Sequence, residues 1–152
     1  MASVPSAEPY RYSSLPDGVF IRVLELKPGE IGSNLDVSLH LEALDRHPHY
    51  VALSYTWGHP DDCATVTCGG KHIKVPRNLH DALQTIRDDS RPIVLWADSI
   101  CIDQHSNKEK NHQVALMGKI YQQASRVIVW LGTDKEGCRQ FHFRTSSPSR
   151  TS

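Results

Sequence analysis

The fold class is indicated first by the run YVALSYTWG, residues 50–58. The run is mostly apolar and ends at Gly58. A strand in the middle of a sheet is covered on both faces, so it shows near-continuous hydrophobicity rather than strict alternation. We therefore expect residues 50–57 to form a central strand, followed by a turn that needs positive φ at Gly58.

Two later runs have the same character: IVLWA at residues 93–97 and RVIVWLG at residues 126–132. A helical pattern separates each pair of runs. The first helix is expected to be capped by Asn78, and its apolar stripe is Leu79, Ala82, Leu83 and Ile86. The second begins with the capping-box sequence SNKE at residues 106–109, and its stripe is Val114, Met117, Ile120, Tyr121 and Ala124. Alternating strands and helices predict a parallel sheet with right-handed crossovers.

Shorter strands are expected outside this centre. Residues 20–26 alternate and predict an edge strand that pairs with residues 37–41. Residues 65–68 and 71–75 flank Gly69-Gly70, the pattern of a two-residue hairpin. The fold class that follows is α/β: an open, mostly parallel sheet with flanking helices and a β-hairpin insertion.

Composition narrows the class of protein. The chain has 152 residues, which suits one domain, and its 17 Lys and Arg balance its 17 Asp and Glu. A nucleic-acid binder needs a surplus of basic residues, so no nucleic-acid partner is expected. Apolar windows are too short for a spanning helix and no secretion signal begins the chain. With only four cysteines, a cytoplasmic protein with reduced thiols and no membrane association is expected.

The two ends differ from the middle. Residues 1–18 contain Pro, Ser and Asp-Gly punctuation and predict a disordered lead. Residues 133–152 are rich in Ser and Thr without periodicity and predict a disordered tail. The folded domain is thus expected to span residues 19–132.

Four ordered blocks resemble the fungal heterokaryon-incompatibility (HET) domain. They are YVALSYTWG at 50–58, VPRNL at 75–79, LWADSICIDQ at 95–104 and VIVWLG at 127–132. Glu109 and Gln113 also stand where that family has them. The signature residues that the resemblance marks are Ser54, Tyr55, Trp57, Gly58, Trp96, Asp98, Cys101, Asp103, Gln104 and Gln113.

The resemblance implies a fungal module of allorecognition that triggers programmed cell death, with a TIR-like, flavodoxin-like sheet. TIR-type enzymes that cleave NAD carry their catalytic Glu after the third parallel strand. Only Glu136 lies there in this chain, so that role does not transfer. HET domains also continue past this Trp-Leu-Gly, so the sequence predicts a domain truncated at its C-terminal end or a mispredicted last exon.

Carboxylates supply the candidate catalytic residues, Glu109 and Asp98. Carboxylates held close together shift one pKa upward for acid–base work, whereas the capping box gives Glu109 a purely structural role. Asp98 and Asp103 flank the carboxyl end of a buried strand, where open sheets bind ligands. With Gln104 they have the donor types that hold Mg²⁺, and a solvated loop is the alternative; no metal site is predicted.

Cysteine and tryptophan side chains leave further alternatives open. Cys101 is either a nucleophile with His105 or His112 as its base, or a buried inert thiol. Cys63 and Cys68 have an adjacent-pair spacing but no second ligand pair for zinc. Three tryptophans follow the strands and form either an aromatic floor for a nucleotide base or core packing, in which each indole N–H finds an acceptor; they are Trp57, Trp96 and Trp130.

Three functions follow from these observations. The first is a heterokaryon-incompatibility module that acts by protein–protein assembly, including self-association through open sheet edges. The second is an NAD glycohydrolase in which Glu109 or Asp98 stabilises the charge on the ribose, with NAD as substrate and no bound cofactor. The third is a truncated, non-functional remnant.

Overall fold

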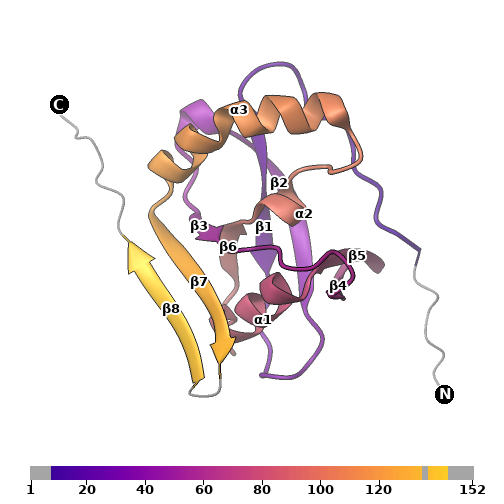
Figure 1. The fold of residues 1–152 in the computed structure, drawn as a ribbon. Helices are drawn as coiled ribbons and strands as arrows, with labels where there is room; N and C mark the ends of the chain where they lie inside the picture. The colour runs from indigo at the N-terminus through magenta and orange to yellow at the C-terminus, as the bar shows by residue number, and fades with distance from the viewer. Residues whose placement is uncertain (1–7, 135–136, 144–152) are drawn as a thin grey trace.

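The computed structural model describes residues 8–134 and 137–143 and shows one sheet with the strand order β5-β4-β2-β1-β6-β3-β7-β8 (Figure 1). The strands are β1 (Phe20–Leu26), β2 (Asp36–Ala43), β3 (Val51–Ser54), β4 (Cys63–Cys68), β5 (Lys71–Pro76), β6 (Ile93–Trp96), β7 (Arg126–Asp134) and β8 (Gly137–Phe143). The helices are η1 (Leu44–Arg46, 3₁₀), α1 (Arg77–Ile86), α2 (Asp98–Cys101) and α3 (Asn107–Gln123). None of these helices is long and apolar enough to cross a membrane.

The centre of the sheet is the predicted set of parallel strands. β3 lies between β6 and β7 and pairs in parallel with both. α1 lies in the connection from β3 to β6, and α3 lies in the connection from β6 to β7. Ala52, Leu53 and Leu95 are fully buried, as the apolar runs predicted. The first, second and third parallel strands along the chain therefore stand in the order second, first, third.

The expectation of a mostly parallel sheet is wrong, because only three of the seven strand pairings are parallel. β1 is also an interior strand rather than an edge, since it pairs antiparallel with both β2 and β6. Ile21, Leu24 and Leu26 are fully buried. Residues 21–24 are buried in succession, which shows that both faces of β1 are covered.

The predicted hairpin is confirmed. β4 and β5 pair antiparallel from Cys68↔Lys71 outward, and the two turn residues, Gly69 and Gly70, have φ of 59° and 80°. Both values lie in the region that favours glycine, which is why a two-residue turn here needs two glycines. β5 forms one edge of the sheet.

Both helices form, with two corrections. α1 is capped at Pro76 and not at Asn78, which lies inside the helix and bonds to other elements. α3 begins as predicted, because the Ser106 side chain accepts a hydrogen bond from the Glu109 N–H. Its predicted stripe is partly wrong: Val114 is 56% exposed, and Gln113 is buried in its place.

The ends are more structured than their composition predicted. Within the expected disordered lead, Tyr10 and His72 share a backbone hydrogen bond and Tyr12 donates to the Ile100 carbonyl, so residues 8–13 lie along β5 and α2. Within the expected disordered tail, β8 pairs antiparallel with β7 and forms the other edge of the sheet (Figure 1). Long-range backbone pairing supplies the order that local composition lacks. Residues 1–7, 135–136 and 144–152 of these two segments lie outside the described residues.

Candidate functional site

A cluster of polar and aromatic side chains forms just beyond the carboxyl ends of β3 and β6. We call Tyr55, Trp57, Asp98 and Ser99 the Asp98 cluster. Tyr55 Oη donates to Asp98 Oδ1 at 2.9 Å, and Trp57 Nε1 donates to the same oxygen at 3.2 Å. The Tyr55 and Ser99 hydroxyls lie 2.6 Å apart. The sequence predicted a site at this edge, and three of the signature residues, Tyr55, Trp57 and Asp98, meet here together with Ser99.

The charge of Asp98 acts on two phenols. Burial, followed by the nearby Asp98 charge, raises the pKa of Tyr55 well above its usual value. Burial and then the same charge raise the pKa of Tyr121 to about 12, and Tyr121 Oη donates to the Leu53 carbonyl at 3.2 Å. Both phenols therefore stay protonated at neutral pH and serve as hydrogen-bond donors.

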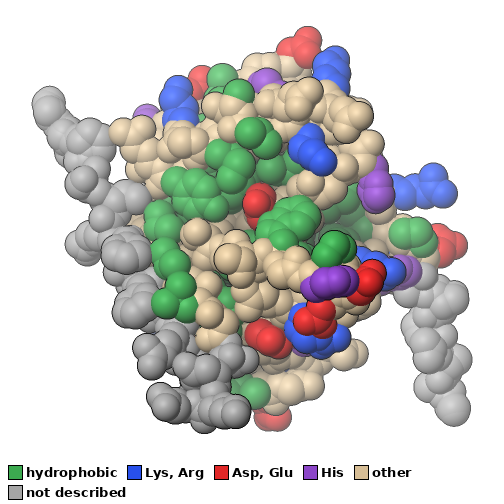
Figure 2. All heavy atoms as spheres, viewed as in Figure 1, with side chains coloured by type: hydrophobic (Ala, Val, Ile, Leu, Met, Phe, Trp, Pro, Cys, Tyr) green, Lys and Arg blue, Asp and Glu red, His purple; other side chains and the backbone are tan. Residues whose placement is uncertain are grey.

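Next to this cluster lies a hollow of about 350 Å³, whose lining includes Trp57, Gly58, Ser99 and Gln104. Gln104 is held there because its Nε2 donates to the Asp98 carbonyl at 2.9 Å. Gly58 has φ of 75°, the positive value that the sequence predicted. Figure 2 shows hydrophobic side chains gathered on the viewed face below α3, with acidic side chains among them.

The three tryptophans do not form a common floor. Trp57 is 42% exposed, whereas Trp96 and Trp130 are buried. Trp130 Nε1 donates to Asn78 Oδ1 at 3.1 Å, so its predicted acceptor exists. Trp96 Nε1 has no partner among residues 8–134 and 137–143, which contradicts the expectation for that indole. Of the three tryptophans, Trp57 alone is exposed to a ligand.

Asn78 links α1 to the segment after β3 and to β7, next to the Asp98 cluster. Its Nδ2 donates to the Thr56 carbonyl at 2.9 Å, while its Oδ1 accepts from Trp130. Through these bonds the start of α1 is tied to the residues after β3 and to β7. Asn78 therefore positions the segment that carries Trp57.

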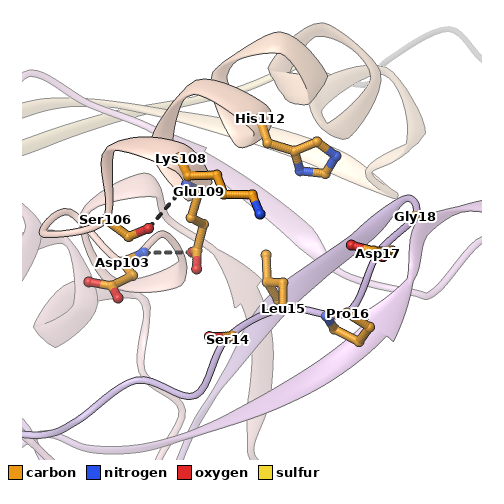
Figure 3. Close-up of a pocket in the computed structure, with 10 residues that line it drawn as sticks. All are labelled: Ser14, Leu15, Pro16, Asp17, Gly18, Asp103, Ser106, Lys108, Glu109 and His112. Carbon is orange, nitrogen blue, oxygen red and sulfur yellow. Dashed lines mark hydrogen bonds between the residues drawn. The ribbon is translucent and has the colours of Figure 1, made fainter.

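Glu109 occupies a different place, at the start of α3 beside a second hollow of about 370 Å³ (Figure 3). Its carboxylate forms a two-pronged ion pair with Arg22: Nη2 donates to Oε1 at 2.9 Å and Nη1 donates to Oε2. Oε2 also accepts from the Asp103 N–H at 2.8 Å, as the dashed line in Figure 3 marks. Burial lowers the pKa of Arg22, but the hydrogen bonds and charge of Glu109 outweigh burial and raise it.

These contacts favour the structural interpretation of Glu109. The carboxylate caps the loop at Asp103 rather than the Ser106 N–H, so the capping box is only half formed. Both of its oxygens are already engaged with donors. A catalytic role for Glu109 stays a prediction, and it would require breaking a buried ion pair.

The remaining acidic and thiol groups are dispersed. Asp103 Oδ1 accepts from the His105 N–H, and no hydrogen bond joins it to Asp98. In the described ranges no group of three or more His, Cys, Asp or Glu could hold a metal ion. Cys63 and Cys68 are five positions apart on β4, so their side chains point to opposite faces of the sheet.

Cys101 is fully buried, and burial raises the pKa of its thiol to about 12. A thiol with such a pKa is protonated at neutral pH and is a poor nucleophile. The structure therefore supports the inert-thiol alternative for this signature residue.

Arg22 is a residue that sequence reasoning missed, whereas Gln113 is one of the predicted signature residues and has a structural role. Gln113 is fully buried and its Nε2 donates to the Phe20 carbonyl at 2.9 Å, which fixes the middle of α3 to β1. The sequence pattern marks Arg22 only as part of a strand, because its partner Glu109 lies 87 residues later. An arginine among inward-facing apolar residues was the available signal, since such a charge needs a partner.

Comparisons with known proteins identify the family. The profile of the family described as "Heterokaryon incompatibility protein (HET)" matches residues 50–152. The chain is also 35% identical over 127 residues to "Heterokaryon incompatibility protein 6, OR allele" of Neurospora crassa, in an alignment that covers 74% of this chain and 18% of that protein. The aligned part of the chain thus spans less than a fifth of the length of that relative. No solved structure matches the chain. The chain belongs to the heterokaryon-incompatibility (HET) family.

Proposed function

We propose that the chain is a heterokaryon-incompatibility module that acts in fungal non-self recognition and programmed cell death through protein–protein assembly. The observation that carries this proposal is the state of Glu109, whose carboxylate is committed to Arg22 and to the Asp103 N–H. A carboxylate in that state stabilises the fold rather than turning over a substrate. Family membership supports the incompatibility context.

Exposed apolar side chains support assembly. Trp57 is 42% exposed, and Val114 and Leu131 are each 56% exposed. Figure 2 shows that hydrophobic side chains lie next to one another on the viewed face. Contiguous apolar surface is typical of protein interaction sites. A cytoplasmic location, where the free thiols of Cys63, Cys68 and Cys101 would stay reduced, belongs to the same proposal.

The second candidate is a TIR-like enzyme that cleaves NAD, with Asp98 as its carboxylate. Two observations favour it. The order β6-β3-β7 matches the first three strands of a flavodoxin-like sheet, whose ligands bind at the carboxyl ends of the strands. Asp98 lies at that edge beside the exposed Trp57.

The purified chain separates the two candidates. Incubation with NAD, followed by chromatography of nicotinamide, is expected to show no turnover for a sample with a cooperative thermal transition. Regulated expression in a fungal host is expected to cause cell death that Asp98→Asn does not abolish. Nicotinamide release that Asp98→Asn removes, without loss of folding, would replace the assembly proposal by the enzyme. A chain that neither folds cooperatively nor acts in the host would support the remnant.

A further inference from the structure

The edge of β5 already accepts an extended segment. Within the hairpin, His72 and Lys74 alternate with the residues that bond to β4, so their backbone groups point away from it. At His72 this outward edge is used: its N–H donates to the Glu8 carbonyl, and its carbonyl accepts from the Tyr10 N–H, both at 2.9 Å. Glu8 also pairs with Lys71 at 2.7 Å. Residues 8–10 thus show how an extended backbone pairs with this strand, and Glu8 shows that a carboxylate binds a lysine beside it.

One step along β5 the same edge is open. Lys74 is exposed, and within the described part of the chain neither its ammonium nor its outward backbone groups have a partner beyond β4. Residues 8–13 have left β5 by this point, because Tyr12 Oη donates to the Ile100 carbonyl at 2.7 Å and Ser13 accepts from Arg22. Between the departing segment and β5 lies a hollow of about 650 Å³.

This hollow continues into the one beside Trp57, since both are lined by Lys74, Ser99 and Gln104. We call the continuous depression the β5 groove. Its wall beside residues 8–13 carries Arg11, and its far end carries Trp57 and Pro60. An extended chain running along β5 would pass a backbone donor and acceptor, two cations and an aromatic end.

The acidic and basic side chains that line the β5 groove differ in whether they already have a partner. Asp62 is already paired with Arg77 at 2.9 Å, and Asp103 accepts from the His105 N–H. By contrast, no ion pair engages Arg11 or Lys74 in residues 8–134 and 137–143. Asp103 also lines the groove and forms no ion pair in the described residues, but Arg11 and Lys74 outnumber it, so the unpaired charge is net positive and favours a ligand with carboxylates.

We propose that the β5 groove binds an extended acidic segment of a partner protein, which adds to the sheet edge at Lys74. This inference rests on the proposed assembly function and names the surface and the kind of partner that it uses. The mode is strand addition, in which main-chain hydrogen bonds give affinity and side-chain pockets give specificity. In this arrangement the carboxylates contact Lys74 and Arg11, and an apolar residue packs against Trp57.

A fluorescent peptide of alternating glutamate and valine tests the proposal by anisotropy with the whole chain. Matched probes are a lysine–valine peptide and a glutamate–valine peptide with a methylated backbone that cannot pair as a strand. Lys74→Glu exchanges an exposed attraction for a repulsion and is expected to weaken binding about three- to tenfold. Lys119→Glu makes the same charge change on an exposed part of α3 away from the groove and serves as the control.

The expected result is binding of the acidic peptide alone, lost on backbone methylation and weakened only by Lys74→Glu. Equal binding of all three peptides, or an equal effect of Lys74→Glu and Lys119→Glu, would overturn the inference. A host-cell death assay with the same variants keeps the two proposals apart. Cell death that persists in Lys74→Glu, together with no peptide binding, would reject the groove and leave the assembly function standing. A wild-type chain that binds the peptide but causes no cell death would reject the assembly function and leave the groove standing.

Discussion

Replacing Glu109 by Leu is expected to destabilise the protein more than any other single charge removal on α3. The Arg22 side chain is 7% exposed and the Glu109 side chain is 9% exposed, so both charges of the ion pair are buried. The substitution leaves the guanidinium buried with only the Ser13 and Cys101 carbonyls as acceptors, and it strips the Asp103 N–H of its acceptor. Breaking a buried pair by removing one partner costs about 3–5 kcal/mol.

The expected loss of stability in Glu109→Leu is large compared with the total free energy of unfolding of a domain. Domains unfold with free energies of about 5–15 kcal/mol, so this single change removes a substantial share. At about 2–4 °C per kcal/mol for a chain of this size, the melting temperature is expected to fall by roughly 6–20 °C. Circular dichroism at increasing temperature and urea titration at 25 °C measure both quantities.

A double-mutant cycle isolates the pair. Arg22→Met combined with Glu109→Leu removes both charges, and a buried pair replaced by apolar groups is often near neutral in stability. The double variant is therefore expected to be more stable than Glu109→Leu alone. Lys108→Ala, an exposed neighbour on the same turn, should change stability by less than about 0.5 kcal/mol. The reasoning would be refuted by a Glu109→Leu cost under about 1 kcal/mol or by additive effects of the two single changes.

Three further predictions concern other parts of the fold. Asn78→Ala leaves the Trp130 indole N–H without its acceptor and is expected to cost about 1–3 kcal/mol, with a change in tryptophan emission as the second readout. In a Cys138→Ser background at pH 8, Cys63 should react with a thiol reagent while Cys101 stays unreactive until urea unfolds the chain, since its thiol is buried and protonated. Burial lowers the pKa of His80 below 6.5, so the unfolded chain binds more protons and stability should fall as the pH drops through 6.5; His80→Gln should flatten that slope in urea titrations.

Local sequence signals predicted the central strands, the hairpin and the family. The apolar runs around Leu53, Leu95 and Ile128 marked the parallel strands because burial on both faces needs continuous hydrophobicity. Gly69-Gly70 fixed the hairpin since a two-residue turn needs positive φ at both positions. Each of these signals is local, so a single sequence carries it in full.

Long-range pairing in the folded chain sets which elements are neighbours. β1 is an interior strand because it pairs with β6, and β8 is a strand because it pairs with β7. The local sequence pattern identifies neither partner. The same holds for the site: Tyr55 meets Asp98 across 43 residues of chain, and Arg22 meets Glu109 across 87. Such pairings depend on the closure of long loops and on the order of strands in the sheet, and these are properties of the whole fold. The residue types therefore predicted that Asp98 and Glu109 are candidate carboxylates. Packing places Asp98 at the carboxyl edge of the sheet and buries Glu109 against Arg22.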